Sequence, residues 1–222
     1  MRIIQATSWS TKQGRIAYVV GNMSTAKKIQ VRLGAKVRAW QAQAAGVNAL
    51  QVMYTIEFED WNAFGKINQA MNADTEWQAF LQNVLGAPDP SATLLTNNLA
   101  MGLPGLDAPA PAGTGPGPRY ASSRSFDLGQ GRRAEAIALL TELKVFVERN
   151  GGRFRATQGV FTGPGSGRIL ATTEHDDVAA FGAYQARSAE DAAMRAFVEN
   201  RIGAVGSPIT IVAASTRSEI PI

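Results

Sequence analysis

Apolar residues recur along the chain in two modes: every second residue in short segments, and every third or fourth residue in longer ones. The first spacing is typical of strands with one buried face and the second of amphipathic helices. Long helical stripes occupy residues 15–33 and 132–150, with Val20 and Leu140 near their centres. Short strand-like segments flank each stripe, so the pattern predicts an α+β protein.

The predicted order of elements is strand, helix, strand, strand, helical region, strand, and it occurs twice. The predicted strands cover residues 2–11, 37–43, 50–58 and 92–98, and then 119–128, 154–161, 168–175 and 209–215. Asp60 and Asp177 directly precede helical stripes, where an aspartate can accept hydrogen bonds from the free amides of the first turn. This β-α-β-β-α-β order defines the ferredoxin-like unit.

The two halves also align residue by residue. Residues 1–105 match residues 118–222 without a gap, most clearly at 57–65 over 174–182, and Gln13-Gly14-Arg15 recurs as Gln130-Gly131-Arg132. A single register held over such a length predicts a tandem duplication.

A segment rich in Pro, Gly and Ala, residues 101–117, separates the copies and is predicted to be a linker. The expected domains are therefore residues 1–100 and 118–222. Each ferredoxin-like unit leaves one sheet face bare, so we expect the units to pack sheet to sheet as an intramolecular pseudo-dimeric α+β barrel. A chain that contains its own partner is plausible as a monomer.

Composition narrows the classes of function. The chain has 222 residues, a net charge of +4 and no cysteine, which excludes disulfides, zinc–thiolate sites and thiol nucleophiles. The basic residues are dispersed, so no nucleic-acid partner is expected. No apolar stretch is long enough for membrane insertion, and a cytoplasmic protein is expected. No spacing indicates a metal or cofactor site.

The third strands and the Asp-capped helices that follow them, around Glu57–Phe80 and Glu174–Phe197, resemble the dimeric α+β barrel superfamily. The similarity is to NIPSNAP-like, stress-responsive barrel and antibiotic-biosynthesis-monooxygenase-like proteins. It implies the barrel fold. Members of the superfamily include cofactor-independent oxygenases, haem-degrading oxygenases, isomerases and proteins without known activity, so the fold leaves the chemistry open.

Three aromatic or imidazole side chains are candidates for a site. His175 is the only histidine and could serve as a catalytic base because the pKa of imidazole lies near neutrality; the alternative is a structural histidine at a strand end. Trp9 and Trp40 lie on predicted strands of the first copy and align with Phe126 and Thr157. They could line an aromatic ligand cleft or serve in sheet packing.

Arg38 and Glu57 are candidate ligand-binding residues on predicted strands, and both recur in the second copy as Arg155 and Glu174. Charged side chains in mid-sheet need partners. An Arg–Glu pairing inside or at the rim of the barrel would provide them; a ligand is the other possibility.

Two functions remain open. The first is a non-catalytic binding or assembly module with a protein partner or a small hydrophobic ligand, which the single histidine and the absence of cysteine favour slightly. The alternative is a cofactor-independent monooxygenase- or isomerase-like enzyme that acts on a small hydrophobic or aromatic molecule. Its cleft would lie between the sheet and helices of the first copy. An enclosed pocket would support the enzyme, and a filled interior with an apolar surface patch would support the module.

Overall fold

A computed structural model describes residues 1–44, 51–107 and 119–222. The first half contains β1 (Ile3–Thr11), α1 (Ile16–Arg32), β2 (Lys36–Ala42), β3 (Gln51–Phe58), α2 (Trp61–Ala73), α3 (Thr75–Leu85) and β4 (Ala92–Gly102). The second half contains β5 (Tyr120–Leu128), α4 (Arg133–Arg149), β6 (Arg153–Phe161), β7 (Ile169–His175), α5 (Val178–Glu190), α6 (Ala192–Phe197) and β8 (Ile209–Ile220). Both halves thus follow the predicted order.

The helix starts agree with the capping expected from the sequence. The side chain of Asp60 accepts a hydrogen bond from the amide of Ala63 at 2.8 Å, and Asp177 accepts one from Ala180 at 2.7 Å. Each bond satisfies an amide that the first helical turn leaves without a partner.

The eight strands form one closed antiparallel barrel with the order β1-β3-β2-β8-β5-β7-β6-β4. Each half contributes four consecutive strands of the barrel. The halves join where the end of β2 pairs with the end of β8 and where β4 pairs with β6. The two sheets therefore meet edge to edge, which corrects the expectation that they would pack with their faces against each other.

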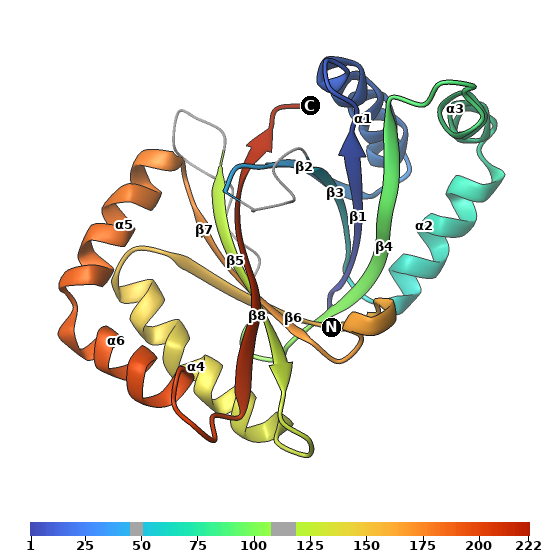
Figure 1. Cartoon of the computed structure of the whole chain (residues 1–222). Coiled ribbons are helices and arrows are strands. Elements are labelled where there is room, and N and C mark those ends of the chain that lie inside the picture. Colours follow the sequence, from blue (N-terminus) through green and yellow to red (C-terminus); the bar gives the residue numbers. More distant parts are fainter. Residues whose placement is uncertain (45–50, 108–118) are drawn as a thin grey trace.

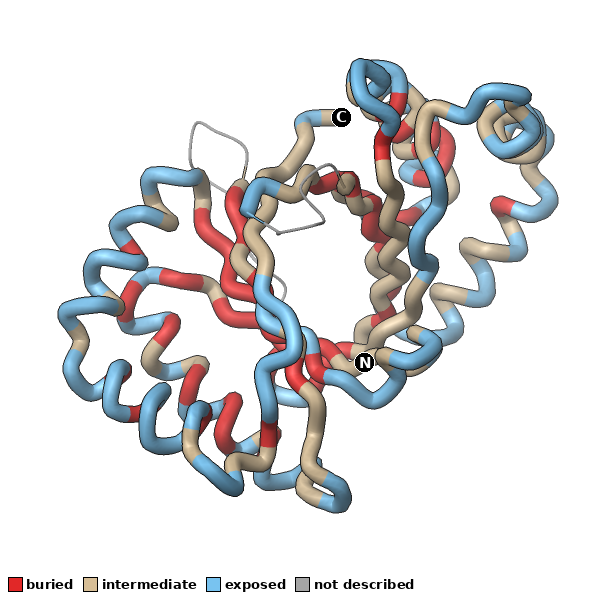
Figure 2. The backbone as a smooth tube through the Cα atoms, in the orientation of Figure 1, coloured by how far each residue is buried: buried red, intermediate tan, exposed pale blue. Residues whose placement is uncertain are grey.

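The helices of each half cover the outside of its own strands (Figure 1). One buried apolar cluster lies under α1 and its neighbours and contains Ile3, Val37 and Ile56. The other lies under α4 and its neighbours and contains Leu140 and Phe154. Figure 2 shows the buried positions concentrated on the strands and on the sides of the helices turned toward them. The apolar cores thus lie between helices and strands, which leaves the inward faces of the strands for other residues.

The last strand of each half is longer than predicted. β4 continues to Gly102 and β8 to Ile220, because these ends pair with strands of the opposite half, a contact that local sequence pattern does not reveal. Beyond β4, Leu103 and Leu106 are fully buried in the core of the second half, so the start of the predicted linker is part of the fold. The rest of the linker, residues 108–118, and most of the predicted turn at 44–49 lie outside the described residues.

None of the helices in the described ranges is long and apolar enough to cross a membrane.

Candidate functional site

Alternation along the strands determines which side chains enter the barrel. In β2, Val37 and Ala39 belong to the apolar core under the helices, so the intervening Arg38 and Trp40 face inward. By the same alternation, Glu57 of β3 and Glu174 of β7 face inward. The barrel interior is therefore charged where the halves meet.

Nine inward side chains form a network that we call the interior charge cluster. It consists of Arg2, Arg38, Glu57, Asp107, Arg119, Arg155, Glu174, Arg217 and Glu219. Several of its ion pairs cross between the halves: Arg38 Nη1 lies 3.1 Å from Glu174 Oε1, and Arg155 Nη1 lies 3.0 Å from Glu57 Oε1. The predicted Arg–Glu pairing thus occurs, and in both cases the shortest contact is to the glutamate of the other half.

Glu174 is the most enclosed carboxylate of the cluster, with a side chain that is 3% exposed. Arg155 and Arg119 approach it at 3.4 and 3.5 Å, in addition to Arg38. Burial acts to raise the pKa of Glu174, but the surrounding guanidinium groups outweigh burial and hold the pKa below its ordinary value. Glu174 is therefore ionised at neutral pH.

Asp107 is the other enclosed acid and lies in the segment that follows β4, five residues after Gly102. Its carboxylate lies 3.5 Å from Arg2 Nε and 3.4 Å from Arg155 Nη2. Burial raises the pKa of Asp107, although both arginines act against the rise. A Cβ atom at Gly102 would lie 2.0 Å from Asp107 Oδ2, so the carboxylate occupies the space that a side chain at position 102 would need.

Arg217 is the exception in the cluster. Among the described residues no carboxylate oxygen lies within ion-pair distance of its guanidinium group, and the segments outside the description contain no Asp or Glu. Its Nη2 reaches Thr172 Oγ1 at 3.3 Å, and its Nη1 lies 3.8 Å from the sulfur of Met53. Burial lowers the pKa of Arg217 to about 10, with Arg38 and Arg155 adding repulsion and Glu174 opposing it.

The indole ring of Trp40 lies between two of these cations. The guanidinium carbon of Arg38 is 4.3 Å from the ring centroid, and that of Arg217 is 5.2 Å from it. Such distances correspond to cation–π contacts. Two buried donors beside this ring, Arg38 Nη2 and Arg217 Nε, have no hydrogen-bond partner in the described part of the chain. A buried donor without an acceptor is costly, so this place suits an acceptor supplied by a ligand.

Solvent reaches this part of the interior. The inward-facing Ala6, Ser8 and Met53 are only partly buried, as is Arg217, whereas the inward-facing Ser123 and Thr172 of the second half are buried. The partly exposed inward positions of this region thus lie on β1, at Met53 of β3 and at the end of β8, whereas Thr55 of β3 is buried.

The structure brings together three of the five candidate residues. Arg38, Trp40 and Glu57 face the interior, but Trp9 packs against the apolar core under the helices of the first half. Trp9 and Trp40 therefore lie on opposite sides of the sheet and do not line one cleft. The sequence analysis missed Arg217, since it ended the last strand at Ser215. The alignment of the repeats contains the signal that could have found it, because the charged Arg217 aligns with the apolar Ala100.

His175 lies apart from the site, on the helix side of β7. It is 1% exposed, and its ring contacts those of Tyr184 at 4.8 Å and Phe181 at 5.4 Å between centroids. Burial lowers the pKa of His175 to about 4, with the charge of Arg153 adding to the effect. Neither ring nitrogen has a hydrogen-bond partner among the residues described. The side chain has the environment of a packing residue.

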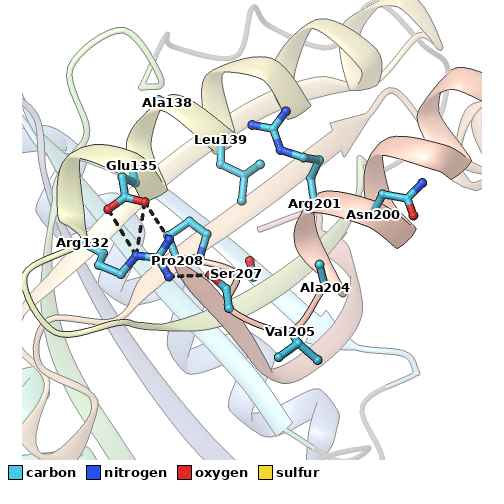
Figure 3. A pocket seen from close by; sticks show the side chains of 11 residues that line it. Arg132, Glu135, Ala138, Leu139, Asn200, Arg201, Ala204, Val205, Ser207 and Pro208 are labelled. Carbon is cyan, nitrogen blue, oxygen red and sulfur yellow. Dashed lines mark hydrogen bonds and ion pairs between the residues drawn. The ribbon is translucent and has the colours of Figure 1, made fainter.

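A surface hollow of about 380 Å³ lies between α4 and the segment that leads into β8 (Figure 3). Its two arginines are engaged: Arg132 pairs with Glu135 at 2.6 Å, and Arg201 pairs with Glu142 at 3.2 Å. Because these ion pairs are exposed and satisfied, the hollow offers weaker recognition chemistry than the barrel interior does.

Comparison with known proteins shows the fold. No sequence-family model matches the chain, and no curated protein matches its sequence. A candidate monooxygenase from Fusobacterium nucleatum superimposes with a TM-score of 0.61 at 8% identity, covering 98% of this chain and 91% of the other. An anthrone oxidase-like protein gives 0.59 at 15% identity, covering 99% and 92%. A candidate chlorite dismutase gives 0.54 at 11% identity, covering 99% and 95%.

These solved structures support the resemblance to the dimeric α+β barrel superfamily at the level of fold, and they do not single out the NIPSNAP-like group. They also correct the functional expectation. The sequence analysis favoured a non-catalytic binding or assembly module, whereas the similar structures carry the names of oxidising enzymes and of a dismutase. The enzyme alternative fits better than the module.

Proposed function

We propose that the chain is a cofactor-independent enzyme of the oxygenase or isomerase kind, acting on a small aromatic molecule inside the barrel. The observation that carries the proposal is that Arg38 Nη2 and Arg217 Nε, beside the Trp40 ring, have no hydrogen-bond partner among the residues that the structure describes. An aromatic wall with fixed cations suits a reaction in which a planar molecule gains negative charge.

The shared chemistry is removal of a proton from a carbon next to a carbonyl group, with a carboxylate of the interior charge cluster accepting the proton. The resulting enolate places its charge on oxygen, where the guanidinium group of Arg217 would stabilise it. In the oxygenase branch the enolate is the reductant for O2: a CH2 group becomes C=O, and the second oxygen atom leaves as water with the two hydrogens. In the isomerase branch the proton returns to a different carbon.

Haem, which some superfamily members degrade, does not fit the residues of this chain. The only histidine is His175, which is enclosed by Phe181 and Tyr184 on the helix side of β7, and the chain has no cysteine. Neither of these common axial ligands is available inside the barrel. We therefore derive no step through haem.

We also infer that residues 1–100 and 118–222 descend from one duplicated unit. The shared element order and the paired Arg38–Glu174 and Arg155–Glu57 contacts support this inference. In such a pseudo-dimer the two copies are free to diverge. Trp40 and Arg217 align with Thr157 and Ala100, so the proposed site exists on one side only.

The test is oxygen uptake by the purified protein with anthrone and a small panel of enolisable aromatic ketones, followed by mass analysis of the products. Anthrone is chosen because one similar structure is named for it. Parallel reactions in deuterated water without O2 detect the proton-transfer branch. We expect either O2 uptake or deuterium incorporation above the uncatalysed rate, reduced at least tenfold in Arg217→Met and unchanged in Arg201→Met. Neither signal with any ketone would overturn the proposal.

A further inference from the structure

We propose, building on the function above, that the substrate is an aromatic carboxylate whose single ionised carboxylate pairs with Arg217 while its ring packs beside Met53. The proposed function requires only a planar molecule that becomes anionic during the reaction. The further step is that the molecule is already a monoanion when it binds.

The balance of charge in the interior supports a monoanion. Within the described ranges, the interior charge cluster holds five arginines and four carboxylates, and the residues outside the description add no acid. Four arginines have a carboxylate within 3.5 Å, and Arg217 does not. One negative charge would neutralise the cluster, whereas a dianion would leave an excess of negative charge and a neutral ligand would leave Arg217 unpaired.

The free donors agree with a carboxylate. Arg38 uses Nε on Glu219 at 3.0 Å and Nη1 on Glu174, which leaves Nη2 free. Arg217 uses Nη2 on Thr172 and leaves Nε free. A guanidinium N–H of Arg217 can donate to a carboxylate oxygen, a charge-assisted pairing stronger than a neutral hydrogen bond.

The surroundings of these donors favour an aromatic body for the ligand. Trp40 itself is 3% exposed and holds the two guanidinium groups against its ring. The thioether of Met53 lies beside Arg217, and sulfur makes favourable contacts with aromatic edges. The accessible face next to the cations thus combines a polarisable sulfur with the inward surface of β1.

The asymmetry of the repeat gives the same indication. The positions that align with Trp40 and Arg217 are Thr157 and Ala100. The paired arginines and glutamates are kept in both halves, whereas the unpaired cation and the indole occur together in one. Structural pairing explains the shared residues but leaves Arg217 without a carboxylate partner among the described residues.

The experiment is equilibrium binding of benzoate and 2-naphthoate to the full chain, measured by calorimetry. The matched neutral ligand is 2-naphthamide, the saturated ligand is cyclohexanecarboxylate, and 2-naphthyl phosphate tests a dianion. We expect one of the two aromatic carboxylates to bind at least tenfold more tightly than each of these three. Arg217→Met should weaken that binding at least tenfold, and Arg201→Met, at an exposed and paired arginine, should change it less than twofold.

Equal binding of the amide, tighter binding of the phosphate, or unchanged binding in Arg217→Met would overturn the proposal, as would the absence of carboxylate binding. Thermal unfolding of each variant shows whether it is folded, and Arg217→Lys, which keeps the charge, should retain part of the affinity. The two proposals can be disproved independently. Oxidation of neutral ketones without carboxylate binding would disprove only the monoanionic substrate. Carboxylate binding without any reaction would disprove only the enzymatic function.

Discussion

Arg38 and Glu174, which belong to opposite halves of the chain, form an ion pair inside the barrel, and Nη1 of the arginine lies 3.1 and 3.2 Å from the two carboxylate oxygens. Arg155 and Glu57 form the equivalent pair in the opposite direction at 3.0 Å. The charges that face inward therefore link the halves, whereas each apolar core is formed mainly by residues of its own half.

Replacing Glu174 by glutamine should destabilise the whole barrel. Arg38, Arg155 and Arg119 all lie within 3.5 Å of its carboxylate and would lose a compensating charge in an enclosed place. We expect a loss of about 3–5 kcal/mol in the free energy of unfolding, measured by denaturant titration. Glu142→Gln, which removes an exposed partner of Arg201, should cost less than about 1 kcal/mol. Equal effects of the two substitutions would contradict the role given to the cluster.

Arg217→Met should have the opposite sign and stabilise the protein. The substitution removes a cation without a carboxylate partner and keeps an unbranched side chain beside Met53 and Trp40. We expect a gain of about 1–3 kcal/mol in the free energy of unfolding. Arg38→Met is the matched comparison and should destabilise, because it leaves Glu174 and Glu219 with fewer partners. A destabilised Arg217→Met would show that Arg217 is held by structural contacts rather than kept for a ligand.

Sequence pattern was sufficient for the order of elements and for the joining of two similar halves. The ion-pair partners could not be predicted, because nothing local in the sequence shows that Arg38 would bind Glu174 of the other half rather than Glu57 of its own. The ends of β4 and β8 were missed for the same reason, since strands of the other half extend them.

The candidate site could be predicted only in part. Asymmetry between the copies pointed to Trp40, which faces the interior, but it applied equally to Trp9, which faces the helices. The uniqueness of His175 suggested chemistry, yet the aligned residue Phe58 is buried in the same way and contacts Phe64 at 5.2 Å. Counting inward charges would have found Arg217, but this requires the face of each strand and the true end of β8.

Gly102→Ala tests the position of Asp107. A Cβ atom at position 102 would lie 2.0 Å from Oδ2 of Asp107 and 2.7 Å from its Cβ, so the carboxylate must move away from Arg2 and Arg155. We expect a loss of about 2–4 kcal/mol in the free energy of unfolding, because two buried guanidinium groups lose part of their compensation. Gly65→Ala in α2 has no atom within 4 Å of its new Cβ and should stabilise by about 0.5–1 kcal/mol. An unchanged free energy of unfolding in Gly102→Ala would show that the observed position of the Asp107 carboxylate does not contribute to stability.

The pH dependence of stability should depend on His175. Burial between Phe181 and Tyr184 lowers its pKa to about 4 in the folded protein, from 6.5 for the free side chain. The unfolded chain therefore binds a proton at higher pH than the folded chain does, and stability falls as the pH drops from about 6.5 to about 4. Phe is the natural replacement, since Phe58 fills the aligned position beneath α2.

Glu174, Asp176, Arg153 and Arg187 contribute to the field at the imidazole and remain in both proteins, so the informative quantity is the difference between wild type and His175→Phe. We subtract the free energy of unfolding of the wild type from that of His175→Phe at each pH, both measured by denaturant titration. We expect this difference to be about 1–2 kcal/mol more favourable to the variant at pH 5 than at pH 8. A difference that does not vary with pH would mean that the imidazole titrates alike in both states. Retention of the activity or of carboxylate binding by His175→Phe would at the same time assign His175 to packing and leave the chemistry to the barrel interior.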